Sequence, residues 1–206
     1  MDPILRAALD GDLAEVQRLV EEDPARVNVT GGLFGRTPLL CASYKGHVAV
    51  VAYLLDQGAV IDHQNTAGKT ALHLACQLGH SEVARLLSDR GADLTLTGQE
   101  GETPFLRACA EGHLDVVLYL MRRDPECIHH QNHFGSTALM NASHFGHTEG
   151  VRVLLQAGAD PTLLDEDGDT AMDDARSRGH PDCVELLEVR IRLRCHESRG
   201  LASTWR

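Results

Sequence analysis

The chain has 206 residues, of which 43% are hydrophobic and 4% aromatic, and 19 Lys and Arg against 30 Asp and Glu give a formal net charge of −11. This composition argues against a disordered chain, and the acidic surplus argues against general nucleic-acid binding because it repels phosphate backbones. No apolar run reaches membrane-spanning length, and the start at Met1-Asp2-Pro3 lacks the basic residues of a secretory signal.

Two sequence markers recur with one period along the chain. A threonine followed by Pro or Ala and then by Leu, Phe or Met occurs five times, and a Gly-His pair comes nine residues later. The threonines are Thr37, Thr70, Thr103, Thr137 and Thr170, and the pairs begin at Gly46, Gly79, Gly112, Gly146 and Gly179. Both series advance by 33, 33, 34 and 33 residues. Two markers with one period predict an array of a single supersecondary unit.

Each unit is expected to contain a first helix, a loop, a second helix and a hairpin. The threonine is an N-cap, and the glycine of the Gly-His pair ends the first helix. The first unit has the same pattern, with Asp2 as the cap, Pro3 at the first helical position and Gly11-Asp12 in place of Gly-His. The predicted array spans 1–197. Its units are approximately 1–31, 32–64, 65–97, 98–131, 132–164 and 165–197.

Small and aliphatic residues fall in register across the units and predict a continuous core. The positions shared by all six units are Ala7, Ala42, Ala75, Ala108, Ala142 and Ala175 on the first helices, and Leu19, Leu54, Leu87, Leu120, Leu154 and Leu187 on the second. A second apolar position three residues before each leucine completes a stripe at helical spacing. Units one and four share a longer exit, Asp23-Pro24 and Asp124-Pro125, which explains the single step of 34.

The C-terminal segment departs from the repeat pattern. Val189–Arg194 alternates apolar and basic residues, a period of two that predicts an extended strand, with a frayed end of the last second helix as the alternative. Residues 198–206 are expected to form a flexible tail. Residues 189–206 carry five arginines and one acid, so the rest of the chain holds a charge of −15.

The repeat pattern resembles the ankyrin repeat, in which T-P-L-H-x-A begins the first helix. The third unit, Thr70-Ala-Leu-His-Leu-Ala75 followed by Gly79-His80, is nearly the consensus. The resemblance implies an all-α ankyrin-repeat solenoid of about six helix-turn-helix units joined by β-hairpin-like tips. It also implies that the Gly-His histidine begins the second helix and bonds locally, and that His73 supports hydrogen bonding between units. Leu40, Leu106, Met140 and Asp173 replace His73 in the other units.

In proteins similar to this one, partners meet a concave surface built from the hairpin tips and the exposed sides of the first helices. Transferred to this chain, that rule predicts a partner-binding set made of tip and first-helix residues. The set is Leu33, Phe34, Arg36, Tyr44, Lys45, Lys69, Gln77, Leu78, Glu100, Glu102, Glu111, His133, Phe134, His144, Phe145, Glu166, Asp167 and Asp169. Its aromatic members are candidate anchors. Its cations fall in units two and three and its acids in units four and six, a gradient that would orient a partner.

Residue groups outside the partner-binding set lead to further interpretations. Arg107, Asn141 and Asp174 share one repeat position and are expected to form a hydrogen-bonded ladder. His129, His130, His133 and His144 with Cys127 are ligand types that suit zinc, but their spacing matches no closed site, so no metal is predicted. Gly31–Gly35 is interpreted as a hairpin tip rather than a phosphate-binding loop. No catalytic motif is found, and neither an enzyme nor a cofactor is predicted.

The sequence therefore favours a non-catalytic scaffold or adaptor that binds a protein through the concave surface. The alternative is an inhibitory or assembly subunit of an enzyme complex, related to a kinase, a ubiquitin ligase or the proteasome. The expected partner is a protein, not a nucleic acid or a membrane, and the chain is expected to be a monomer. Buried-type cysteines favour a reducing compartment, the cytoplasm, with the nucleus left open.

Overall fold

The computed structural model describes the backbone of residues 2–203 and the side chains of residues 2–194. Twelve α-helices in the described chain form six consecutive pairs. They are α1 Pro3–Asp10, α2 Leu13–Glu22, α3 Pro38–Lys45, α4 Val48–Asp56, α5 Ala71–Gln77, α6 Ser81–Asp89, α7 Pro104–Glu111, α8 Leu114–Arg123, α9 Ala138–His144, α10 Thr148–Gln156, α11 Ala171–Arg178 and α12 Pro181–Ser203. No helix in this part of the chain is long and apolar enough to cross a membrane.

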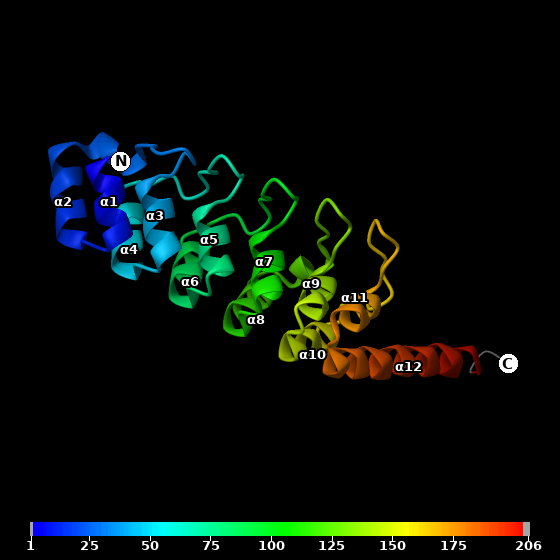
Figure 1. Ribbon diagram of the computed structural model, residues 1–206. Coiled ribbons are helices and arrows are strands. Elements are labelled where there is room, and N and C mark those ends of the chain that lie inside the picture. The colour runs from blue at the N-terminus through cyan, green and yellow to red at the C-terminus, as the bar shows by residue number, and fades with distance from the viewer. Residues whose placement is uncertain (1, 204–206) are drawn as a thin grey trace.

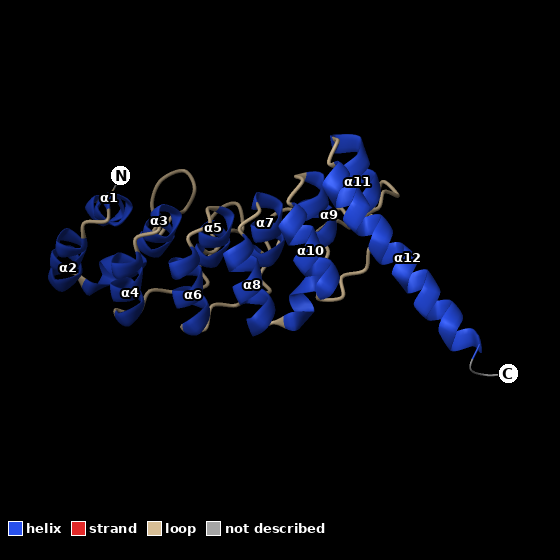
Figure 2. Ribbon diagram, turned by 90° about the horizontal axis from the view of Figure 1, so that it is seen from below, coloured by secondary structure: helices blue, strands red, loops and turns tan. Residues whose placement is uncertain are grey.

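The pairs stack side by side into an elongated solenoid (Figure 1). The first helices form one row and the second helices another, and the tips between pairs project along one edge (Figures 1 and 2). The tips are hairpin-like turns rather than strands: residues 2–203 contain only isolated β-bridges, at Gly31 with Arg36 and at Gln131 with Thr137. The longer exits of units one and four are 3₁₀ turns, η1 Pro24–Asn28 and η2 Pro125–His129, each capped by the preceding aspartate.

Each first helix from α3 onward begins at the predicted threonine. The hydroxyl oxygens of these threonines accept a hydrogen bond from the backbone amide three residues later, at 3.2–3.3 Å. Asp2 caps α1 in a similar way, accepting from the amide of Ile4 at 3.1 Å. An N-cap of this kind contributes about 1 kcal/mol to stability. In α5, α9 and α11 the residue at the consensus histidine position closes the cap, since His73, Met140 and Asp173 accept from the amide of their own threonine.

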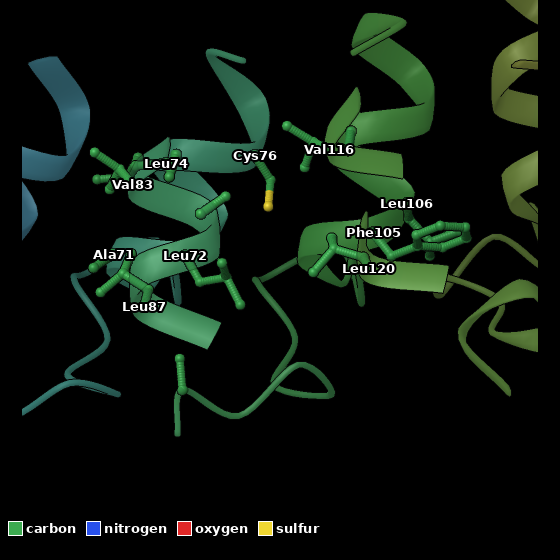
Figure 3. Close-up of a cluster of buried hydrophobic side chains, with 14 of the residues drawn as sticks. Ala71, Leu72, Leu74, Cys76, Val83, Leu87, Phe105, Leu106, Val116 and Leu120 are labelled. Carbon is green, nitrogen blue, oxygen red and sulfur yellow. The ribbon is translucent and has the colours of Figure 1, made fainter. Parts of the chain in front are cut away.

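The core lies between the two rows of helices and runs through all six units. The alanine column is buried in every unit, which lets the first helices approach closely, and the leucine column of the second helices is buried beside it. Figure 3 shows one section, in which Leu72 and Leu87 of unit three and Leu106 and Leu120 of unit four fill the space between helices. Val184 of the last unit is only partly buried.

The Gly-His histidines connect each unit to the one before it. In all five, the imidazole Nε2–H donates to a backbone carbonyl near the end of the preceding unit's first helix, at 2.8–3.1 Å. The acceptors are the carbonyls of Leu9, Tyr44, Gln77, Ala110 and His144. The expectation that these histidines bond locally is therefore wrong. Each occupies the N-cap position of its second helix, and in α4, α6, α8 and α10 it makes no capping bond there.

In the first four Gly-His pairs, the histidine of the next unit leaves no room for a side chain at the glycine. Gly46 has a φ of 76°, a left-handed conformation that favours glycine. A Cβ at this position would lie 2.7 Å from Nδ1 of His80. In unit one, Asp12 stands in place of the histidine and caps α2 by accepting from the amide of Glu15 at 3.0 Å. Each of the five histidines thus has a carbonyl of the preceding unit as its acceptor.

The C-terminal segment is helical, so the prediction of a strand over Val189–Arg194 is wrong and α12 continues through it to Ser203. A helix places Leu186, Val189 and Leu193 on one side, because they are three or four residues apart. With Arg152, Leu155 and Gln156 of α10 they line a cavity of about 340 Å³. Arg194 also pairs with Asp160 of the preceding unit at 2.5 Å. The tail expected over 198–206 is helical as far as Ser203, and 204–206 lie outside the described residues.

Replacing a central Gly-His histidine should destabilise the whole array. His113→Ala removes the donor to the Gln77 carbonyl and leaves a cavity beside Gly79. Loss of the bond and the contact is expected to lower the free energy of unfolding by about 1–3 kcal/mol. Urea denaturation followed by circular dichroism measures the change. The control is His129→Ala, an exposed histidine, which should leave the midpoint within experimental error; equal effects of the two variants would contradict the role assigned to His113.

Candidate functional site

The candidate site is the surface formed by the hairpin tips and the adjoining sides of the first helices, called here the tip surface. Neighbouring tips are joined through their backbones. The amides of Thr66, Gln99, His133 and Glu166 donate to carbonyls of the preceding tips at 3.0–3.2 Å. In three tips, a side-chain oxygen of Asn65, Asn132 or Asp165 accepts hydrogen bonds from two backbone amides of the same loop. Asn65 Oδ1, for example, accepts from the amides of Ala67 and Lys69. The tip surface is therefore a connected frame rather than a row of independent loops.

The N-terminal end of the tip surface combines aromatic rings with cations. The guanidinium carbon of Arg36 lies 5.3 Å from the ring centre of Phe34 and 5.1 Å from that of Tyr44. The Lys45 ammonium lies 5.4 Å from the Tyr44 ring. Leu33 is 92% exposed and Phe34 is 55% exposed, whereas Tyr44 packs partly against the core. The structure thus brings into contact four residues that the sequence predicted individually for binding, namely Phe34, Arg36, Tyr44 and Lys45.

The middle of the tip surface is polar and paired within the protein. Lys69 Nζ donates to Gln77 Oε1 at 2.8 Å, and burial lowers the pKa of Lys69. Arg107 forms an ion pair with Glu102 and lies 3.9 Å from Glu111. A cavity of about 200 Å³ between units three and four is lined by Lys69, Gln77, Glu102 and Arg107, among others. Because Arg107 lies against Glu102 and Glu111, this section is less acidic than the sequence gradient suggested.

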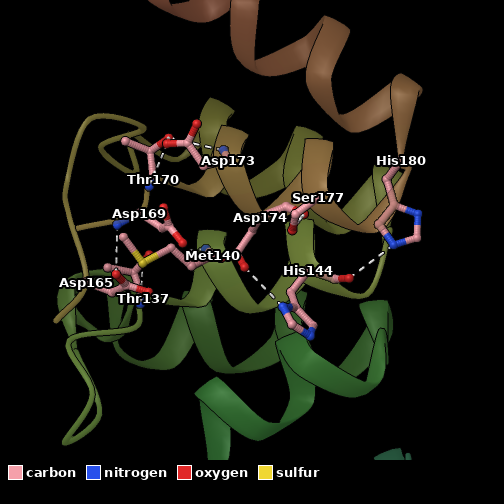
Figure 4. A network of polar contacts seen from close by, with 10 residues as sticks. All are labelled: Thr137, Met140, His144, Asp165, Asp169, Thr170, Asp173, Asp174, Ser177 and His180. Carbon is pink, nitrogen blue, oxygen red and sulfur yellow. Dashed lines mark hydrogen bonds and ion pairs between the residues drawn. The ribbon is translucent and has the colours of Figure 1, made fainter. Parts of the chain in front are cut away.

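The predicted ladder of Arg107, Asn141 and Asp174 is wrong. Arg107 pairs with Glu102 of its own unit, and Asp174 Oδ1 instead meets His144 Nδ1 of the preceding unit at 3.0 Å (Figure 4). Among the described residues no hydrogen bond joins Asn141 to either side chain. Sharing a repeat position places these residues in adjacent units, but their side-chain directions take them to different partners.

The C-terminal end of the tip surface is acidic and aromatic. Phe134 and Phe145 are 53% and 55% exposed, and the Phe145 ring meets His144 edge-on at 4.8 Å. A depression of about 380 Å³ beside them is lined by Ser136, Asn141, His144, Phe145, Asp165, Asp167, Asp169, Asp174, Ser177 and Arg178. Desolvation, together with the nearby carboxylates of Asp165 and Asp173, raises the pKa of Asp169. Asp165 is also structural, since it accepts from the amide of Asp167 and from that of Asp169, the latter shown in Figure 4.

The four aromatic anchors therefore form two groups rather than one. Phe34 and Tyr44 belong to unit two, Phe134 and Phe145 to unit five, and units three and four lie between them (Figure 1). The remaining predicted residues are placed along the same edge: Leu78, Glu100 and His133 are exposed, as are Glu166 and Asp167 in the last tip. Sequence reasoning missed the stacking of Arg36 on two rings. It also missed the participation of Asn141 and Asp174 in the acidic depression.

The histidines and cysteines considered for zinc have separate environments. Cys127 is buried, and burial raises the pKa of its thiol to about 12. His144 is engaged by Asp174, and His129 is exposed. Within the residues that the structure describes, no three His, Cys, Asp or Glu side chains gather into a metal-sized cluster. Cys41 is likewise buried, with a pKa raised to about 11, so neither thiol is poised for chemistry.

Comparison with known families identifies the repeat. The family described as Ankyrin repeats (3 copies) matches residues 4–98 and 105–194. The chain belongs to the ankyrin-repeat family. This assignment confirms the fold expected from the spacing of the Thr and Gly-His markers. Ankyrin repeats are in general non-catalytic interaction domains.

Curated relatives share parts of this ankyrin array. Alpha-latrotoxin-Lh1a of Latrodectus hasselti is 45% identical over 190 residues, which cover 91% of this chain and 14% of the toxin. E3 ubiquitin-protein ligase hecd-1 of Caenorhabditis elegans is 44% identical over 54 residues, 26% of this chain and 2% of the ligase. The chain thus spans only a small fraction of these relatives.

One solved structure is similar over nearly the whole chain. It is a chain from the complex of the predatory endopeptidase Bd0816 of Bdellovibrio bacteriovorus with the immunity protein Bd3460. The two superpose with a TM-score of 0.83 and 29% sequence identity, over 91% of this chain and 97% of the other. The similarity therefore extends over most of both chains and not only over a single repeat.

His73 gives the array a measurable pH dependence. Its Nε2–H donates to the Glu102 carbonyl at 3.0 Å, and burial lowers its pKa to about 4. The unfolded chain takes up this proton near pH 6.5, so it binds more protons than the folded chain between pH 4 and 6.5. The contribution of neutral His73 is therefore complete above pH 6.5 and is lost as the pH falls toward 4, by about 3 kcal/mol at most.

The test compares wild type with His73→Leu, since Leu40 and Leu106 occupy this position in units two and four. As the pH is lowered from 7 to 4, the urea midpoint should fall less steeply for the variant than for the wild type. It should also lose some stability at pH 7, because the bond to Glu102 is gone. Parallel pH profiles for the two proteins would show that His73 does not titrate as described.

Proposed function

We propose that this protein is a non-catalytic scaffold or adaptor that binds a partner protein through the tip surface. The observation that carries the proposal is the connected tip frame, which holds exposed aromatic side chains and unlike charges at its two ends. A preformed surface loses little conformational entropy on binding, so affinity depends mainly on its anchors. The cations of unit two and the acidic depression between units five and six orient the partner along the array.

A second candidate is an inhibitory subunit that blocks an enzyme. It is favoured by the near-full-length similarity to a chain from the complex of an endopeptidase with an immunity protein. Both candidates use the same tip surface and differ in the effect of binding on the partner: the adaptor leaves its partner active, whereas the inhibitor suppresses it. The relatives with ubiquitin-ligase names match only about a quarter of the chain and favour neither candidate.

We also place the protein in the cytoplasm as a monomer, with the nucleus as a second compartment. The five cysteines with described side chains are buried free thiols, a usage typical of a reducing compartment. Fractionation of the native host cell and sedimentation of the purified protein test these two points. A secreted or self-associating protein would contradict them.

Truncating the C-terminal aromatic pair should abolish capture of the partner. Phe134→Ala with Phe145→Ala removes two side chains that are more than half exposed. If they are binding hot spots, the loss is about 2 kcal/mol or more, at least a tenfold weakening. The measurement is pull-down from lysate of the native host with mass spectrometry, followed by an activity assay of any captured enzyme with and without this protein.

The matched control is Val189→Ala with Leu193→Ala on α12, whose side chains are 49% and 50% exposed. It removes similar exposed apolar area away from the tips, and both variants should keep the helical signal in circular dichroism. If the control loses the partner and the phenylalanine variant keeps it, binding occurs elsewhere and the proposal is wrong.

A further inference from the structure

The loop over residues 31–36 is held in place at both of its ends. Gly31 and Arg36 exchange two backbone hydrogen bonds of 3.0 Å, and a Cβ at Gly31 would lie 2.5 Å from Cδ1 of Leu5. The Phe34 carbonyl accepts from the amide of Thr66, and the Gly35 carbonyl from His63 Nε2–H at 3.2 Å. The loop that precedes α3 stands out from the row of first helices (Figure 2). Its exposed side chains are therefore displayed on a fixed frame.

The Arg36 side chain is held in place by aromatic rings, but its charge is not paired with a carboxylate among the described side chains. Its guanidinium lies over Phe34 and Tyr44, and its Nε is buried without a hydrogen-bond partner. Among the described side chains no carboxylate pairs with it, although the chain has a marked excess of acids. Arg107, also on the tip surface, differs because Glu102 neutralises it. A cation held by two rings and left unpaired is suited to a charge supplied by another molecule.

The geometry of the guanidinium indicates that the charge supplied by the other molecule is a carboxylate. A guanidinium is planar and binds a carboxylate bidentately, and an arginine already held over two rings needs little further ordering to do so. Lys45, over the same Tyr44 ring, adds a second cation, and Leu33 and Phe34 add exposed apolar area. We propose that this end of the tip surface binds an acidic segment of a protein partner. One carboxylate meets Arg36, and an apolar side chain of the same segment packs on Leu33 and Phe34.

This inference rests on the proposed function and names the chemistry of the partner at one end. A short acidic protein segment fits better than a nucleic acid because the cations are few and local. A chain of phosphates continuing along the tips would reach Glu100, Glu102 and Glu111 in unit four, where like charge repels it. A protein segment can place its acids over Arg36 and other residues over the acidic tips.

The test uses two fluorescein-labelled peptides of equal length. One contains Asp and Glu interspersed with Phe and Leu, and the other has Asn and Gln at the acidic positions. Fluorescence anisotropy should show tighter binding of the acidic peptide, weakened by salt. Arg36→Gln should weaken it by roughly ten- to a hundred-fold, the effect of losing a charged hydrogen-bonded pair. Arg36→Lys, which keeps the charge but not the planar fork, should lie between.

The matched control is Arg85→Gln. The Arg85 guanidinium carbon lies 5.5 Å from the ring centre of Tyr119, so it is also an arginine over an aromatic ring, but on the second helices. This variant should bind the acidic peptide as wild type does. Equal binding of the two peptides, or equal losses in Arg36→Gln and Arg85→Gln, overturns the inference. Tighter, Arg36-dependent binding of a single-stranded RNA or a phosphorylated peptide would also overturn it, in favour of phosphate.

Thermal unfolding followed by circular dichroism shows that each variant is folded before its binding is interpreted. The outcome is separable from that of the proposed function. A protein that ignores the acidic peptide but captures a partner through Phe134 and Phe145 overturns only this inference. A protein that binds the acidic peptide through Arg36 but captures nothing from native lysate supports this inference and contradicts the proposed function.

Discussion

The whole array depends on a hydrogen bond that no single unit can make. In each Gly-His pair the imidazole donates to a carbonyl of the preceding first helix, about one repeat earlier in the chain. The ring also occupies the space in which a side chain would lie if the glycine that ends the first helix of the preceding unit were replaced. One interaction therefore satisfies an end-of-helix carbonyl, fixes the distance between units and requires glycine. A solenoid whose stability comes largely from such interfaces behaves as a chain of coupled neighbours.

Rigid stacking of the units makes a recognition surface from separated residues. Because adjacent tips share backbone hydrogen bonds, side chains from units two to six keep fixed positions along one edge. That edge is polar and self-paired in the middle, where Glu102 neutralises Arg107. Its ends differ: one carries a stacked cation without a partner, the other an acidic depression beside two phenylalanines. Such an arrangement distinguishes the two directions in which an elongated partner could lie.

The terminal units depart from the repeat for a physical reason. In unit one, Asp12 stands at the histidine position and caps its own helix. At the other end a Cβ at Gly179 would meet no atom of the described chain within 4 Å, because no further Gly-His histidine packs against it. Near Gly179, the C-terminal part of α11 is polar and exposed, and Arg176 of this helix pairs with Glu188 of α12. Both ends thus replace the contact between units by contacts within a unit.

The sequence alone determined the period, the helix starts and the core columns. Caps and apolar stripes depend on residues within about four positions of one another, so Thr37 or Leu54 could be assigned without coordinates. It also placed the binding candidates on one surface, since stacking repeats align equivalent positions. Only the tertiary structure decided the partners of His80, Arg107 and Arg36, and the helical course of Val189–Arg194. Those outcomes depend on side-chain directions and packing between units, where residues about one repeat apart meet, and a linear pattern does not record them.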